Sequence, residues 1–197
     1  MKQGFVKVAA ASCAVAVADV RENTRVILET IHKMEDEGAK VMVLPELALT
    51  GYTCSDLFWQ SQMIDAAKEG LKEIADGTKG TDALIFVGLP WEQGGKLFNV
   101  AAVLCHGELL GVVPKKYLPN YNEFYELRHF TPGKEAVTTT EFFGKEVPFG
   151  MNLLFQCAEM PRLKVAAELC EDLSDPESAE CGACPGRCDS DRQSFRE

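Results

Sequence analysis

The sequence lacks an apolar run long enough to cross a membrane. A spanning helix needs about 18 to 20 largely apolar residues, and no stretch of the chain reaches that length. Residues 8–20 are the most apolar, and behind Lys2 and Lys7 they faintly resemble a lipoprotein signal. A signal is disfavoured because few basic residues precede the run, and because Asp19 and Arg21 follow it without a cleavage motif. We expect a buried first strand instead. We therefore expect a cytoplasmic protein with no membrane partner.

Basic charge is also scarce. The chain has 20 lysines and arginines against 30 acidic residues, for a net charge of −10. Nucleic-acid binding needs clustered cationic side chains that neutralise phosphates. The charge balance therefore argues against a nucleic-acid partner and favours a small-molecule substrate.

Histidines and phosphate-binding loops are equally rare. There are three histidines, and none follows a predicted strand in a setting suited to a Cys–His pair. No Gly-rich phosphate loop is present, since Gly94, Gly95 and Gly107 are typical of turns. Of the eight cysteines, those before the tail are scattered singly, as free thiols in a reducing compartment are.

The chain does have the composition of one globular domain, with 46% hydrophobic and 25% charged residues. Apolar periodicity predicts strands over residues 5–10, 40–44, 83–89, 151–157 and 163–169, a hairpin over 97–113, and helices over 23–38, capped by Asn23-Thr24, and 57–75. Strands that alternate with helices and then with a hairpin predict an α/β fold of two stacked, mixed sheets.

Three reactive residues stand just beyond predicted strands: Glu46, Lys115 and Cys170. Strand ends of one sheet can bring distant residues together and hold them rigidly. A carboxylate could then deprotonate the thiol, and an ammonium could stabilise an oxyanion. Taken alone, each residue could equally be a solvated or packed strand end.

The segments around these residues are more specific. VLPELALTGYTCSDLF, VPKKYLPNYNEFYELRHFTPG and ELCEDL resemble, in order and spacing, three motif regions of the carbon–nitrogen hydrolase (nitrilase) family. LTGYTCSDLF and YLPNYNEFYE more narrowly resemble the glutamine-hydrolysing domains of glutamine-dependent NAD+ synthetases. The resemblance covers residues 5–173. It implies a nitrilase-like four-layer α-β-β-α sandwich, incomplete at the C-terminus.

The resemblance also implies roles for single residues. Glu46 would be the general base, Lys115 the oxyanion stabiliser and Cys170 the nucleophile. Lys116 is the rival of Lys115, but Lys115 holds the place of the family's lysine. Glu123 matches the family's second glutamate, which positions the lysine and the substrate.

Glutamine is the substrate that the resemblance implies. Tyr52, Phe124 and Glu171 would hold it, although the two aromatic residues could equally belong to the core. The glutaminase reaction needs no metal or cofactor. ATP and Mg²⁺ are expected only in a synthetase domain, normally on the same chain, which these residues do not include; full-length members are expected to form homo-oligomers. The alternatives are a stand-alone hydrolase of another small amide or nitrile, and an inactive truncated remnant.

The resemblance stops after Leu173, which divides the chain into a hydrolase domain, residues 1–173, and an atypical tail, residues 174–197. Cys181, Cys184 and Cys188 could bind zinc or an iron–sulfur cluster, but no fourth ligand is evident.

A change of reading frame explains the tail better. Permissive codons for residues 183–197, read one base later, translate as HALAGATVIANLSA, close to the run that the family has there. We therefore expect a frame change between Ser174 and Ala183, and no buried strand in the tail. A sandwich without its following strands would leave apolar faces uncovered, so we expect the 197-residue chain to fold marginally and to show little activity.

Overall fold

The computed structural model describes residues 4–173 and 192–195, the latter by backbone alone. The elements are β1 (Val8–Ala10), α1 (Val20–Asp36), β2 (Val41–Val43), the 3₁₀ helix η1 (Ser55–Trp59), α2 (Ser61–Gly77), β3 (Leu84–Gln93), β4 (Lys96–Cys105), β5 (Glu108–Pro114), α3 (Glu126–His129), β6 (Thr138–Phe142), β7 (Lys145–Phe149), β8 (Leu154–Cys157), β9 (Lys164–Val165), the 3₁₀ helix η2 (Cys170–Leu173) and β10 (Arg192–Phe195). None of the described helices is long and apolar enough to span a bilayer.

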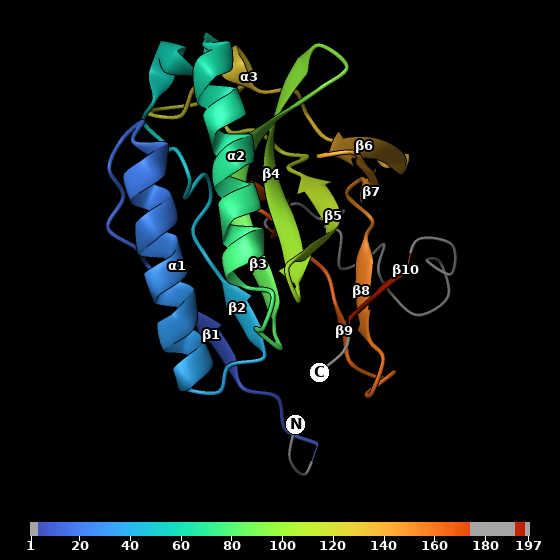
Figure 1. Cartoon of the computed structure of the whole chain (residues 1–197). Helices are drawn as coiled ribbons and strands as arrows, with labels where there is room; N and C mark the ends of the chain where they lie inside the picture. Colours follow the sequence, from blue (N-terminus) through green and yellow to red (C-terminus); the bar gives the residue numbers. More distant parts are fainter. Residues whose placement is uncertain (1–3, 174–191, 196–197) are drawn as a thin grey trace.

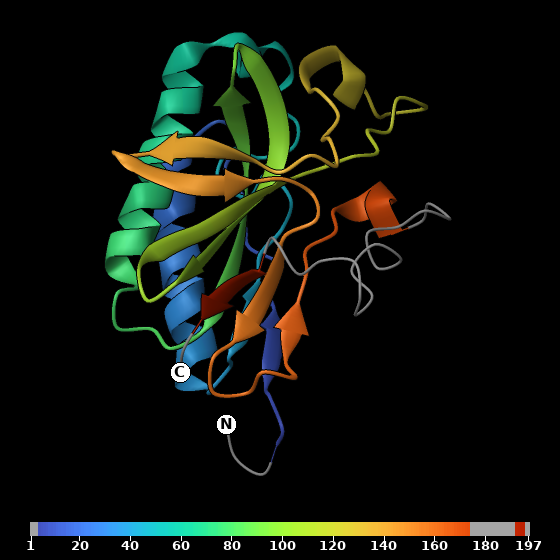
Figure 2. The same ribbon diagram turned by 90° about the vertical axis from the view of Figure 1, so that its right-hand side faces the viewer.

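Two stacked sheets form the centre of the molecule. The larger is mixed, with strand order β1-β2-β3-β4-β5-β7-β6, and the smaller has the order β10-β8-β9. Helices α1 and α2 cover one face of the large sheet, and the small sheet lies on the other side (Figures 1 and 2). The predicted α/β fold with stacked mixed sheets is confirmed. The described residues thus build an α-β-β stack.

The large sheet has an apolar core on each face, because side chains alternate along a strand. On β3, Ile85 and Val87 face the helices, whereas Leu84 and Phe86 belong to the core on the side of the small sheet. Phe86 meets Phe155 of β8 edge to face, with ring centroids 6.1 Å apart. A strand that is buried on both faces reads as a continuous apolar run, as residues 83–89 do.

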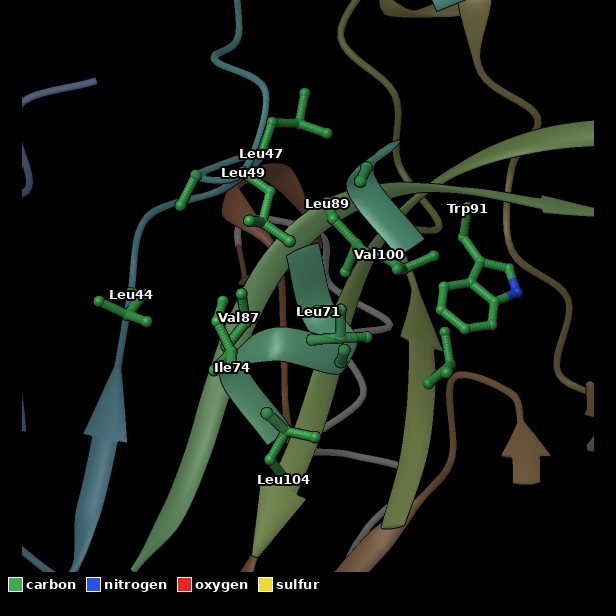
Figure 3. Close-up of a cluster of buried hydrophobic side chains, with 14 of the residues drawn as sticks. Leu44, Leu47, Leu49, Leu71, Ile74, Val87, Leu89, Trp91, Val100 and Leu104 are labelled. Carbon is green, nitrogen blue, oxygen red and sulfur yellow. The ribbon is translucent and has the colours of Figure 1, made fainter. Parts of the chain in front are cut away.

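The helices pack through apolar stripes of helical period. On α2 the stripe includes Leu71 and Ile74, both fully buried. Figure 3 shows the two side chains lying over Val87 of the large sheet. Helix α1 begins at Val20 rather than at the predicted Asn23-Thr24 cap.

The difference at α1 has a local cause. Asp19 is the N-cap, and its Oδ1 accepts from the Glu22 amide at 3.0 Å. Asn23 is buried inside the helix instead, where its side chain bonds the backbone of Ala16 and Leu49.

Three strand predictions need correction. The first strand is an exposed edge, with Val8 66% accessible, and is not buried. The predicted strand over 163–169 keeps only β9, because the chain then leaves the sheet and leads to Cys170. The hairpin of β6 and β7 was not predicted, since its polar residues face solvent and hide the apolar alternation.

The tail is only partly described. Residues 174–191 and 196–197, on which the predicted domain boundary, the cysteine-rich metal site and the frame change depend, lie outside the described residues. The backbone of β10 pairs in parallel with β8. A strand therefore forms at the end of the tail. The prediction that the tail holds no buried strand stays a prediction, because the side chains of β10 are not described.

Gly88 allows the loop after β2 to cross the large sheet closely. A Cβ at this position would lie 2.5 Å from the Leu47 nitrogen and would overlap the carbonyl oxygen of Pro45. Both contacts are with backbone atoms, which cannot rotate away. The absence of a side chain at Gly88 therefore sets where Glu46 sits.

We expect Gly88→Ala to lower the free energy of unfolding by about 2–3 kcal/mol, because the added methyl must displace the Pro45–Leu47 backbone. Urea denaturation would measure the loss. Gly80→Ala is the matched control, since a Cβ there meets open space. Equal stability of the two variants would contradict the close approach at Gly88.

Candidate active site

Lys115 is the centre of a buried charged cluster. It follows β5 directly and has no solvent exposure. Its Nζ lies 2.8 Å from Glu46 Oε1 and 2.7 Å from Glu126 Oε1. Lys116, the rival in the sequence, instead places its ammonium over the Tyr117 ring. The structure thus brings Glu46 and Lys115 together.

The second carboxylate of this cluster is Glu126, not Glu123. Glu126 opens α3 and is 3% exposed. Glu123 lies three positions earlier and lines a cavity beside it. Among the described ion pairs, Lys115 is thus held by Glu126 and not by Glu123, the residue that the resemblance implied. The residues around Glu126 are mostly polar, so the sequence does not indicate that this glutamate is buried. Its separation from Lys115 along the chain does not indicate that the two side chains meet.

Asn99 joins the two carboxylates. It is fully buried on β4, and its Nδ2 donates to Glu46 Oε1 and, at 3.5 Å, to Glu126 Oε2. Its Oδ1 has no hydrogen-bond partner among the described residues. This orientation is still favoured, because turning the amide would place its oxygen against two carboxylates. Sequence reasoning missed Asn99, which is hidden in an apolar strand.

Tyr52 completes the polar surroundings of Glu126. Its hydroxyl donates to Glu126 Oε1 at 2.7 Å. Burial, followed by the hydrogen bond to Glu126, holds the pKa of Tyr52 well above its usual value, so the phenol stays a donor.

Burial also governs the charges inside the cluster. It raises the pKa of Glu126 despite the hydrogen bonds from Lys115 and Tyr52. For Lys115, burial disfavours the ammonium, but Glu46 and Glu126 outweigh it and raise the pKa. The ammonium is therefore charged at neutral pH.

Cys170 begins η2 beside this cluster. Its side chain is exposed and its backbone is left-handed, with φ of 48°. Partial desolvation by its neighbours raises the pKa of the thiol; Lys115 opposes this, whereas Glu46 and Glu171 add to it. The sulfur is therefore protonated at neutral pH, and a base must remove its proton before it can act as a nucleophile.

Two cavities reach the cluster from different sides. Glu46 and Cys170 line one of about 270 Å³, whose other walls come from β2, β3 and residues 165–169. Tyr52, Glu123 and Glu126 line another of about 410 Å³. The base and the nucleophile of the predicted site therefore share one cavity.

The predicted substrate residues form a row that leads toward Cys170. The Tyr52 and Phe124 rings meet edge on, with centroids 6.3 Å apart. The Phe124 and Tyr121 rings also meet edge on, with centroids 5.6 Å apart. The Tyr121 hydroxyl in turn donates to Glu171, the residue after Cys170. Tyr121, which the sequence did not single out, connects the three.

This arrangement suits acyl transfer at an amide. A carboxylate beside a neutral thiol can serve as its base, and an ammonium has three N–H donors. Two of those of Lys115 reach Glu46 and Glu126, which leaves one for a developing oxyanion. Among the described residues there is no group of His, Cys, Asp and Glu placed to hold a metal ion.

Comparison with known proteins identifies the family of the chain. Residues 7–180 match the carbon–nitrogen hydrolase family. The chain therefore belongs to the carbon–nitrogen hydrolase family.

Within that family, similar curated proteins include glutamine-dependent NAD+ synthetases. The one from Mycobacterium tuberculosis is 35% identical over 175 residues, which are 89% of this chain and 26% of the relative. The one from Arabidopsis thaliana is 31% identical over 168 residues, which are 80% of this chain and 23% of the relative. The chain thus spans about a quarter of the curated relatives that it matches.

Solved structures agree. The glutamine-dependent NAD+ synthetase of Cytophaga hutchinsonii superposes with a TM-score of 0.71 at 28% identity, over 79% of this chain and 28% of that one. An amidase from Nesterenkonia sp. has the same fold, with a TM-score of 0.59 at 22% identity over 79% of this chain and 57% of that one.

We expect Lys115→Met to lower the free energy of unfolding by about 3–5 kcal/mol, because it leaves two buried carboxylates without their cation. The folded-state pKa of Glu126, already raised by burial, should rise further. A carboxyl whose folded pKa exceeds its unfolded value loses stability as pH rises. The loss should therefore be larger at pH 8 than at pH 5, as measured by urea denaturation.

Lys40→Met is the matched control, since it breaks a half-buried pair with Asp82 at the other end of β2. A loss for Lys115→Met that matched this control, or that did not change with pH, would contradict the buried-cluster account.

Proposed function

We propose that the site hydrolyses the side-chain amide of glutamine, and that the ammonia serves ATP-dependent synthesis of NAD+ from nicotinic acid adenine dinucleotide. One observation carries the proposal. Lys115 is buried between Glu46 and Glu126, beside a cavity that Glu46 shares with Cys170. The names of the relatives, glutamine-dependent NAD+ synthetases, support the choice of substrate and product.

The first step forms the nucleophile. Glu46 takes the proton of the Cys170 thiol, whose pKa is raised above its usual value. The sulfur attacks the amide carbon, and the C=O electron pair moves to the oxygen. The free N–H of Lys115, with a backbone N–H near Cys170, stabilises that oxyanion.

The later steps return the proton and release the product. Glu46 passes its proton to the amide nitrogen, the C–N bond breaks, and ammonia leaves behind a glutamyl thioester. A water molecule then gives a proton to Glu46 and attacks the thioester carbon. The C–S bond breaks, the proton returns to Cys170, and glutamate is released.

Glutamine would lie along the row of Tyr52, Phe124 and Glu171. The Glu171 carboxylate, one residue from the nucleophile, can pair with the substrate's α-ammonium. The two aromatic rings, in edge contact, can pack against its methylene groups. A neutral amide without an ammonium would not use Glu171, which separates glutamine from simpler amides.

The glutaminase reaction itself requires no cofactor in this proposal. ATP and Mg²⁺ belong to the synthetase domain that uses the ammonia. The division of the chain after residue 173, and the meaning of its tail, stay predictions.

The alternative is a stand-alone hydrolase of another small amide or nitrile. The fold shared with the Nesterenkonia amidase shows that this architecture is not confined to synthetases. An inactive remnant is the third possibility.

Ammonia release from glutamine by the purified 197-residue chain tests the proposal. We expect slow hydrolysis that Cys170→Ala and Glu46→Gln each reduce by about 10³-fold or more, because one removes the nucleophile and the other the base. Acetamide and carbamoyl compounds should be poorer substrates. A cooperatively unfolding chain that prefers those compounds would favour the stand-alone hydrolase, and a chain without a cooperative transition would be the inactive remnant.

The two neighbouring glutamates provide a second test. Glu126→Gln should reduce kcat by about 10²-fold, because the amide cannot hold Lys115 as an ion partner. Glu123→Gln is its matched control and should keep kcat within about threefold, since Glu123 has no ion pair with Lys115 among the described contacts. Equal losses in kcat, measured by steady-state kinetics, would restore Glu123 to the lysine site.

A further inference from the structure

Asp172 is a buried carboxylate that the reaction above does not use. It is 7% exposed and lies two residues after Cys170 in η2. Its Oδ1 accepts from the backbone N–H of Lys116 at 3.0 Å and of Tyr117 at 2.8 Å. Its Oδ2 accepts from the backbone N–H of Leu169 at 3.3 Å.

These hydrogen bonds join two segments that carry the proposed chemistry. Lys116 and Tyr117 come directly after Lys115, and Leu169 comes directly before Cys170. The two segments belong to different parts of the fold, because Lys115 follows β5 of the large sheet, whereas Cys170 follows β9 of the small sheet.

The backbone of Lys115 is held from other directions. Its N–H donates to Asn99 O at 2.9 Å, and its carbonyl accepts from the Gly133 N–H at 2.7 Å. These bonds fix the lysine to β4 and to the loop around Gly133. The carboxylate of Asp172 connects this frame to the turn that carries the thiol through backbone N–H groups, in addition to the hydrogen bond from Tyr121 to Glu171.

The turn itself needs such support. A left-handed φ of 48° at a non-glycine residue such as Cys170 is costly and persists only where its surroundings hold it. Asp172 closes the turn twice, since its own N–H donates to Leu169 O at 3.1 Å while its carboxylate accepts from the Leu169 N–H.

A carboxylate suits this place because it only accepts hydrogen bonds. Its two oxygens accept hydrogen bonds from three backbone N–H groups, and the side chain brings no N–H of its own against them. An asparagine could keep one acceptor, but its NH₂ group would face one of the donors. The conservative change should therefore retain part of the connection, and alanine should lose it.

We propose that Asp172 is a positioning residue, which holds the Cys170 turn against the end of β5 so that the thiol lies beside Glu46 and Lys115. The proposal rests on the proposed function, which assigns the thiol its base.

Alkylation of Cys170 by iodoacetamide, followed by peptide mapping, tests the position of the thiol without glutamine. At neutral pH we expect Glu46→Gln to speed alkylation by about tenfold in the otherwise unchanged chain, because the Glu46 carboxylate raises the pKa of the neighbouring thiol and its removal leaves more thiolate. In Asp172→Ala the same Glu46 change should alter the rate less than about twofold, since the thiol no longer lies beside Glu46. In Asp172→Asn the effect of Glu46→Gln on the rate should lie between those two values. This variant replaces Asp172→Ala in the comparison if the alanine variant does not fold.

Asp82→Ala is the matched control. It removes a half-buried carboxylate that pairs with Lys40 at the far end of β2, and should leave the effect of Glu46→Gln unchanged. A merely structural role for Asp172 would lower the melting temperature but keep the Glu46 effect.

Two results would overturn the proposal. One is a full Glu46 effect in both Asp172 variants, and the other is no Glu46 effect in the unchanged chain. A third result separates the two proposals. If Glu46→Gln changes the alkylation rate only while Asp172 is present, but the chain does not hydrolyse glutamine, the proposed function fails and the positioning role of Asp172 stands.

Discussion

The buried ammonium of Lys115 is the interaction on which the site depends. Moving such a charge out of water costs several kcal/mol, and only close anions with further hydrogen bonds offset that cost. Glu46 and Glu126 supply the anions, and Tyr52 and Asn99 supply donors to their oxygens. Because these five residues come from four segments, the fold must bring a strand, two loops and the start of α3 to one point.

The large sheet meets that requirement through its strand ends. Asn99 lies on the central strand β4, next to the end of β5 that carries Lys115. Glu46 reaches them only because the loop after β2 crosses β3 at Gly88. The position of the base therefore follows from the absence of a side chain on a neighbouring strand. This is why a single methyl group on Gly88 should disturb the position of Glu46.

The sequence predicts some of this site and not the rest. Glu46, Lys115 and Cys170 could be found because each follows an apolar run that ends at a reactive residue. Glu126 could not, since a buried glutamate in a polar segment reads like a solvated one, and motif spacing led to Glu123 instead. The β6–β7 hairpin escaped for a similar reason: its alternation is mostly polar. Tertiary contacts, which periodicity does not report, decide these cases.

Charge inside the cluster explains why two glutamates are needed. One ammonium between two carboxylates leaves a net negative charge, which favours uptake of a proton. Glu126 is enclosed and bonded to Lys115 and Tyr52, whereas Glu46 is 21% exposed and opens to the cavity of Cys170. Of these two carboxylates, Glu46 is the one that shares a cavity with the thiol, so in the proposed reaction Glu46 takes its proton. While Glu46 is neutral, Glu126 still holds Lys115 charged, so the oxyanion keeps its donor throughout the step in which the base is protonated.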